Sequence, residues 1–135
     1  MNEKRCFKVD KLIRDHAAHV LGEKGVQVFT RTMGTAEYQV RLSNKLLEEA
    51  KEIMNAKTQE ERIEECADLL EVLYAFSQAH GFTMEHIEAK RRAKRAEKGG
   101  FEQKIYSDHV EVAPENPETR YYSARPEDYP EIITA

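Results

Sequence analysis

The sequence lacks any long apolar run, and it has only two cysteines and no large excess of one charge. No stretch reaches the roughly 18 apolar residues of a membrane span, and no apolar run follows the charged N-terminal residues. We therefore expect a cytoplasmic protein without membrane contact. Cys6 and Cys66 have no neighbouring Cys or His at metal-site spacing, so both are expected to be ordinary reduced thiols. A net charge of -4 indicates no general affinity for nucleic acid.

Apolar periodicity and capping residues predict an all-α fold, a helical bundle. Its core is expected to include Leu46, Ala50, Ile53, Leu69, Leu70, Val72, Leu73 and Phe76. The segments expected to be helical are 10–22, Thr35 to about Ala56, Thr58 to about His80, and Met84–Lys98. Residues 26–32 and 101–106 could add short β segments, because the first of these alternates and is rich in β-branched residues.

Length and proline placement predict one domain followed by a tail. The 135 residues suit a single core, which we assign to residues 1–106. Residues 107–135 lack apolar periodicity and are interrupted by prolines, so they are expected to form an extended tail. Its tyrosines indicate packing on the domain or on a neighbouring subunit.

Four acidic residues occupy helix positions that should be apolar: Glu49, Glu52, Glu65 and Asp68. Asp68 has apolar neighbours on almost every side, so it is predicted to be buried. A buried, unpaired carboxylate costs several kcal/mol, and this cost must be offset by a cation cluster or by a metal ion.

The spacing of these acids favours the metal. Each pair is three residues apart, about 60° around a helix, and can aim two oxygens at one point. Two such helices packed antiparallel would bring the four carboxylates together. Oxygen ligands suit Mg²⁺ or Mn²⁺ better than zinc. Acids at this spacing can also form a solvated helix face, which suits Glu60, Glu61 and Glu64.

The helix 84–98 is strongly basic towards its end. Its cations can be explained as a solvated face favoured by the helix dipole. However, Arg91, Lys94 and Lys98 continue the apolar line of Ile87, which would set cations beside the carboxylates. Carboxylates that hold Mg²⁺ next to cations are the parts needed to act on a polyphosphate.

The acidic motif Glu48-Glu49-x-x-Glu52, followed by Glu65-x-x-Asp68, resembles that of the all-α nucleoside triphosphate pyrophosphohydrolases of the MazG-like superfamily, which includes phosphoribosyl-ATP pyrophosphohydrolase. Further matches to a small house-cleaning branch are Lys11-Leu12-Ile13-Arg14-Asp15, Lys45-Leu46, and Lys94 through Lys98-Gly99-Gly100-Phe101. The resemblance covers about residues 11–106.

The resemblance implies a Mg²⁺-dependent enzyme that cleaves a nucleoside triphosphate, which could be a damaged one, or a related nucleotide to the monophosphate and pyrophosphate. Glu49, Glu52, Glu65 and Asp68 would bind the metal, and Glu48 would position or deprotonate the attacking water. Candidates for phosphate contacts are Lys11, Arg14, Lys45 and Lys94. The family also implies a homodimer or homotetramer.

Two other classes of protein could use similar parts. A di-iron carboxylate bundle wants Glu-x-x-His pairs, but Glu52 and Asp68 stand where the histidines would be. A non-enzymatic helical module could bind RNA or an acidic partner through residues 90–98. That module would leave Asp68 unexplained, and the segment has no aromatic residue for base stacking.

Overall fold

The computed structural model describes residues 3–133. Residues 1–2 of the predicted domain and residues 134–135 of the predicted tail lie outside the described residues. The chain divides into two compact units, Met1–Ala96 and Glu97–Ala135. The helices of the described residues are α1 (Ala17–Glu23), α2 (Thr35–Asn55), α3 (Gln59–Ala79), α4 (Met84–Lys98) and α5 (Thr119–Ser123). The prediction of an all-α protein is confirmed.

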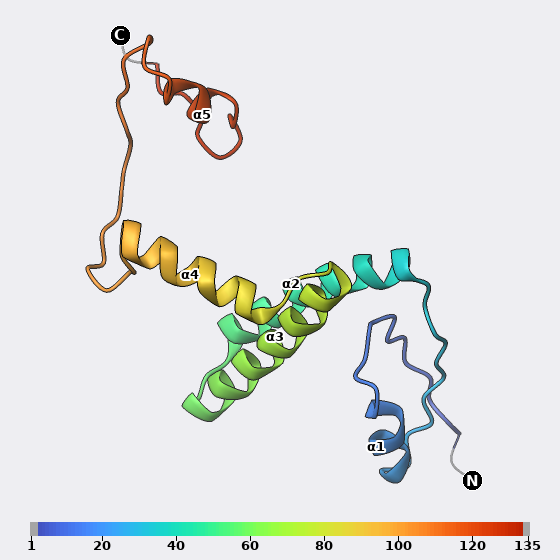
Figure 1. Cartoon of the computed structure of the whole chain (residues 1–135). Coiled ribbons are helices and arrows are strands. Elements are labelled where there is room, and N and C mark those ends of the chain that lie inside the picture. The colour runs from blue at the N-terminus through green and yellow to red at the C-terminus, as the bar shows by residue number, and fades with distance from the viewer. Residues whose placement is uncertain (1–2, 134–135) are drawn as a thin grey trace. The chain divides into compact units, whose positions relative to one another are not determined.

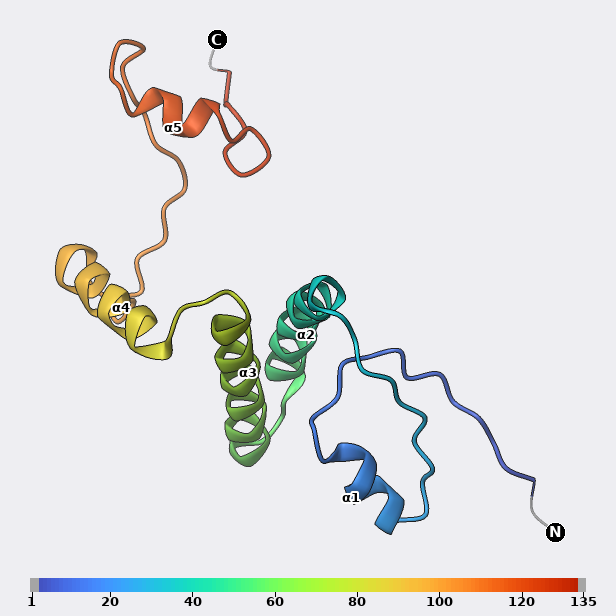
Figure 2. The same cartoon turned by 45° about the vertical axis from the view of Figure 1, so that its right-hand side comes forward.

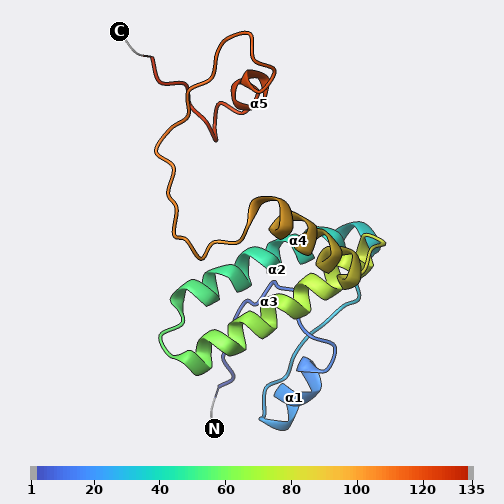
Figure 3. The ribbon, with the colours of Figure 1, turned by 60° about the vertical axis from the view of Figure 1, so that its left-hand side comes forward.

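Helices α2 and α3 form the packed pair on which the first unit is built (Figure 1). They lie side by side in Figure 2, and Figure 3 shows the short connection that turns the chain back between them. The Gln39 side-chain amide near the start of α2 donates to the Ala79 carbonyl at the end of α3, at 3.2 Å. The pair is therefore antiparallel, as the acidic spacing required.

Local capping sets the limits of α3. The Thr58 hydroxyl accepts a hydrogen bond from the Glu61 backbone N–H at 3.1 Å, which satisfies one of the free donors of the first turn. The Glu61 carboxylate accepts from the Lys57 N–H at 2.8 Å. At the other end Gly81 adopts a φ of 81°, a left-handed conformation that glycine takes at little cost. Both ends of α3 therefore lie within one residue of the predicted ends, Thr58 and His80.

The interior of the helix pair is small. Among the described residues, Leu42 is the one hydrophobic residue that is fully enclosed, and Ser77 lies buried on the facing helix. Most of the predicted core is half-buried: Leu46, Ala50, Ile53, Leu69, Val72, Leu73 and Phe76. Leu70 was predicted to be in the core but is 50% exposed, because α3 packs against α2 along one face only.

The segments 26–32 and 101–106 form no strand in the described part of the chain. Two short segments with no third strand beside them bury too little surface to hold a sheet together. The first helix is also shorter than expected, because Lys11 to Arg14 carry no helix and α1 begins at Ala17.

The second unit has little regular structure apart from α5. Residues 104–113 form neither helix nor strand, while α5 lies within residues 107–135, which were predicted to be extended. The rings of Tyr121, Tyr122 and Tyr129 contact one another, with centroids 5.1 to 5.8 Å apart, and the Arg125 guanidinium lies 4.2 Å from the Tyr121 ring centroid. Within residues 3–133 no helix is both long and apolar enough to cross a membrane.

Candidate metal centre

Three of the four predicted metal ligands converge between α2 and α3. One carboxylate oxygen from each of Glu49, Glu65 and Asp68 lies within 4.8 Å of the other two. Glu49 comes from α2, while Glu65 and Asp68 come from adjacent turns of α3. Three oxygens this close can contact one small cation together, and carboxylates are the ligands that hard divalent ions prefer. The acidic cluster could therefore hold a divalent metal.

The prediction that Asp68 is buried is wrong. Its side chain is 41% exposed, whereas the side chain of Glu49 is only 10% exposed. Asp68 has apolar neighbours along the helix, but Cys66, Ala67 and Leu70 are themselves exposed. The composition of a helix does not determine which of its faces another helix covers. The cost of an unpaired buried charge therefore applies to Glu49 more than to Asp68.

Electrostatics show that the carboxylates act on one another. Burial raises the pKa of Glu49, and repulsion from Asp68, Glu48 and Glu52 adds to the rise against the attraction of Lys45. Desolvation also raises the pKa of Glu65, together with repulsion from Asp68, Glu52 and Glu49. Glu52 is exposed and is not within the close group of three, but it contributes negative charge to both. Excess negative charge of this kind favours cation binding.

Glu48 is held by two lysines beside this cluster. The Lys11 ammonium donates to its Oε1 at 3.1 Å, and the Lys45 ammonium donates to its Oε2 at 3.3 Å. Lys45 also lies 3.7 Å from Oε1 of Glu49, so it bridges the two neighbouring carboxylates. Partial burial acts to raise the pKa of Glu48, but the two lysine hydrogen bonds outweigh it and lower the pKa. Glu48 is therefore ionised and weakly basic in this arrangement.

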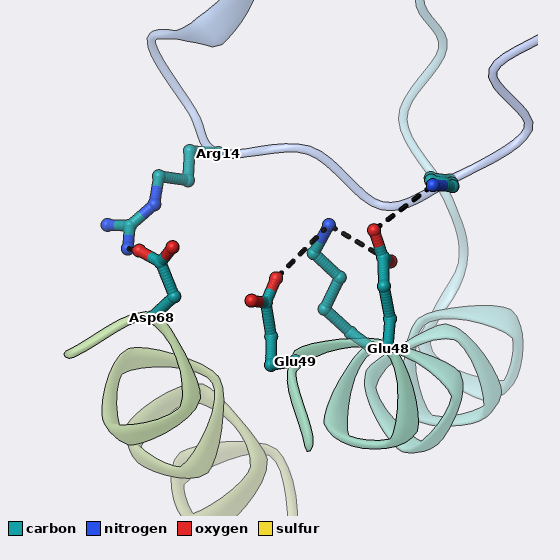
Figure 4. Close-up of polar contacts among 6 residues, drawn as sticks. Arg14, Glu48, Glu49 and Asp68 are labelled. Atoms are coloured by element: carbon teal, nitrogen blue, oxygen red, sulfur yellow. Dashed lines mark hydrogen bonds and ion pairs between the residues drawn. The ribbon is translucent and has the colours of Figure 1, made fainter. Parts of the chain in front are cut away.

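Arg14 is the third cation that contacts these carboxylates. Its guanidinium Nη2 donates to Oδ1 of Asp68 at 2.8 Å (Figure 4). The Arg14 side chain reaches from the N-terminal segment to α3, and Glu48 and Glu49 extend from the facing helix. Three of the four predicted phosphate-binding residues thus contact the carboxylates, namely Lys11, Arg14 and Lys45.

Lys94, the fourth, lies elsewhere in the first unit. It lines a shallow groove of about 420 Å³ along α4, together with Phe82, His86, Ile87, Lys90 and Arg91. Arg91 donates to Glu88 on its own helix at 2.6 and 2.8 Å, and these bonds help lower the pKa of Glu88 to about 2. The stripe on α4 had suggested that Lys94 would lie beside the carboxylates, whereas the cations in the ion pairs described above are Lys11, Arg14 and Lys45.

Sequence reasoning missed these cation contacts. Lys11 and Glu48 are 37 residues apart in the chain, and Arg14 and Asp68 are 54 apart. No periodicity connects such positions, because contacts between distant segments depend on the path of the chain. The one available signal was that Lys11 and Arg14 lie one helical turn apart, a spacing that also suits an exposed face.

The fold and the site together define an all-helical protein with an acidic cluster able to hold a divalent cation. A model of the phosphoribosyl-ATP pyrophosphohydrolase family matches residues 18–95, and the chain belongs to this family. The matched residues contain every carboxylate of the cluster, and the resemblance noted from the acidic motif is confirmed. A search of the curated proteins and a search of the solved structures returned no significant match.

Proposed function

We propose that this protein is a Mg²⁺-dependent pyrophosphohydrolase that cleaves a nucleoside triphosphate to the monophosphate and pyrophosphate. Membership of the family implies hydrolysis of a nucleotide phosphoanhydride. The observation that carries the proposal is the group of three carboxylate oxygens from two facing helices, within 4.8 Å of one another. Mn²⁺ could replace Mg²⁺ in such an oxygen site.

The roles proposed for the side chains follow from their positions. Glu49, Glu65 and Asp68 would hold the metal, and Glu52 would add charge at the edge of the site. When bound, a divalent cation neutralises phosphate charge and polarises the phosphorus. Glu48 is proposed to orient the attacking water, since its lowered pKa makes it a weak base.

The proposed reaction is hydrolysis between the α- and β-phosphates. Water adds to the α-phosphorus, the bond to the bridging oxygen breaks, and pyrophosphate leaves. The phosphates would be contacted by the three cations beside the carboxylates, Lys11, Arg14 and Lys45. Lys94 would contact them from α4. Charge-assisted hydrogen bonds of this kind are the strong ones in phosphate recognition. A cytoplasmic location remains a prediction.

A panel of normal and damaged nucleoside triphosphates, together with phosphoribosyl-ATP, tests this function by the release of pyrophosphate in the presence of Mg²⁺. Glu65→Gln should abolish activity, because it removes one of the three converging carboxylates. Glu64→Gln is the matched control, since it neutralises the adjacent acid on the same helix. Release of orthophosphate in place of pyrophosphate would contradict the proposed cleavage. Equal activity of the two variants would contradict the proposed metal site.

We also propose that the protein is a homodimer or homotetramer. Val40, Leu47 and Met54 recur every seven residues on α2 and are 59%, 66% and 78% exposed. On α3, Ile63 and Leu70 show the same spacing and are also exposed. Lines of apolar side chains at this interval suit packing against further helices. Sedimentation analysis should give an oligomer for the wild type and a smaller species for Leu47→Glu.

The rival function is binding of RNA or an acidic partner through residues 90–98. Intrahelical ion pairs count against it, because Glu88 engages both Arg91 and Arg92. A salt-titrated RNA-binding assay separates the two functions. Affinity that falls steeply with salt, together with no pyrophosphate release, would favour the rival.

A further inference from the structure

The N-terminal segment 11–14 crosses the acidic cluster and is tied to both helices. Lys11 contacts Glu48 on α2 and Arg14 contacts Asp68 on α3, at 3.1 and 2.8 Å. The segment itself carries no helix. Asp10, just before it, adopts a φ of 53°, a left-handed conformation that turns the chain ahead of Lys11. Two cations on a non-helical segment thus hold two neighbouring helices at their acidic faces.

A metal ion and this segment would share Asp68, and Lys11 neutralises Glu48 directly beside the proposed metal ligand Glu49. Asp68 belongs to the close group of three, and one of its oxygens accepts from Arg14. Glu48 directly precedes Glu49, and Lys45 lies within 4 Å of both. A divalent cation placed among these groups would repel the guanidinium and ammonium groups that already neutralise them.

Lys45 and the two cations of the N-terminal segment differ in how easily they can move away from the carboxylates. Lys45 belongs to α2 and is therefore fixed at the site by the helix that also carries Glu48 and Glu49. Lys11 and Arg14 are both more than half exposed, and each meets its partner at the end of a long side chain. Exposed pairs of this kind are individually weak, so they can exchange for a stronger ligand.

We propose that residues 11–14 form an electrostatic strap that competes with the divalent metal for the carboxylates, and that metal binding releases Lys11 and Arg14 towards the phosphates of the substrate. This inference rests on the proposed metal-dependent function. It adds an order of events, in which the metal binds first and the two cations of the binding site become available afterwards. The strap thereby couples occupancy of the metal site to recognition of a polyphosphate anion.

The first test measures Mn²⁺ binding by calorimetry, without nucleotide, for the wild type and for the double variant Lys11→Ala/Arg14→Ala. Loss of the competing cations should tighten Mn²⁺ binding about two- to fivefold for each pair removed. Lys8→Ala is the control, because it removes a positive charge three residues before the segment, and Lys8 pairs with Asp10 at 3.9 Å and not with the cluster. Its Mn²⁺ affinity should equal that of the wild type.

Hydrogen exchange gives a readout that does not depend on affinity. Amides of residues 8–16 should exchange faster in the wild type once Mn²⁺ is added. In the double variant they should exchange fast with or without the metal. Exchange of the wild-type segment that is unchanged or slowed by Mn²⁺ would overturn the strap.

The second test uses inorganic triphosphate as the probe on the Mn²⁺-loaded protein. The double variant should bind triphosphate at least about tenfold more weakly than Lys8→Ala does, since it lacks two charge-assisted contacts. The strap thus predicts opposite changes in one protein: tighter metal binding and weaker polyphosphate binding. A double variant that binds Mn²⁺ no more tightly than the wild type would overturn it.

The failures of the two proposals are distinguishable. If the wild type binds no Mn²⁺, both the metal centre and the strap are refuted. If the wild type binds Mn²⁺ and Glu65→Gln weakens that binding, the metal centre stands. In that case an unaltered or weakened affinity of the double variant refutes the strap alone, because Lys11 and Arg14 would then be supporting the site instead of competing for it.

Discussion

Replacing Asp68 with Asn separates a catalytic carboxylate from a structural one. The change removes one negative charge and nearly preserves the shape of the side chain. It removes the ion pair between Asp68 and Arg14, whose side chains are 41% and 63% exposed respectively. An ion pair this exposed contributes about 0 to 1 kcal/mol to stability. It also relieves the repulsion that Asp68 exerts on Glu49 and Glu65. The two effects oppose each other, so we expect the free energy of unfolding to change by less than about 1 kcal/mol.

Activity should respond very differently. A metal held by fewer charged oxygens stabilises the transition state less, and a loss of about 3 kcal/mol corresponds to a rate reduction of roughly a hundredfold or more. Mg²⁺ at a hundred times its dissociation constant should stabilise the wild type by about 2.7 kcal/mol, and should stabilise the variant by less. The measurements are thermal unfolding with and without Mg²⁺, and pyrophosphate release.

Glu71→Gln is the control for the Asp68 variant, since it neutralises an exposed acid on the same helix outside the cluster. It should retain both activity and the stabilisation by Mg²⁺. A structural role for Asp68 would give the opposite result. Asp68→Asn would then unfold more easily than the metal-free wild type by roughly 3 to 5 kcal/mol, and the wild type would not respond to Mg²⁺.

Lys94→Ala should raise KM about tenfold or more with unchanged stability, since a charge-assisted phosphate contact is worth about 1.5 to 3 kcal/mol; an unchanged KM would leave Lys94 as a solvated cation. Thr58→Ala should lower the free energy of unfolding, measured with urea, by about 1 kcal/mol, because it removes the cap of α3. Thr35→Ala should lower it by less, because the start of α2 has no side-chain cap. The raised pKa values of Glu49 and Glu65 mean that the folded chain retains their protons to higher pH than the unfolded chain does. Their contribution to stability is therefore present below the ordinary carboxyl pKa of 4.5 and is lost as pH rises through the raised pKa values. The affinity for Mn²⁺ should rise over the same pH range, because the carboxylates become ionised. Urea unfolding and calorimetry at a series of pH values check the two changes.

Helices α2, α3 and α4 and the acidic motif were predictable from the sequence alone, because they depend on local chemistry. Thr58 caps α3 through a hydrogen bond to a residue three positions along, and Gly81 ends it by adopting a left-handed conformation. Glu65 and Asp68 share one side of α3 because of helical geometry alone. Interactions within one or two helical turns can be read from spacing, and the family resemblance was visible in the same residues.

The contacts between distant parts of the chain and the covering of the helix faces could not be predicted, because they depend on the path of the whole chain. Lys11 and Arg14 lie on a non-helical segment and contact Glu48 and Asp68, and no spacing in the sequence indicates these pairs. Asp68 and Leu70 were expected to be buried, yet both are substantially exposed. Periodicity reports that a helix has an apolar face, but the covering of that face depends on a second surface whose position no local pattern specifies.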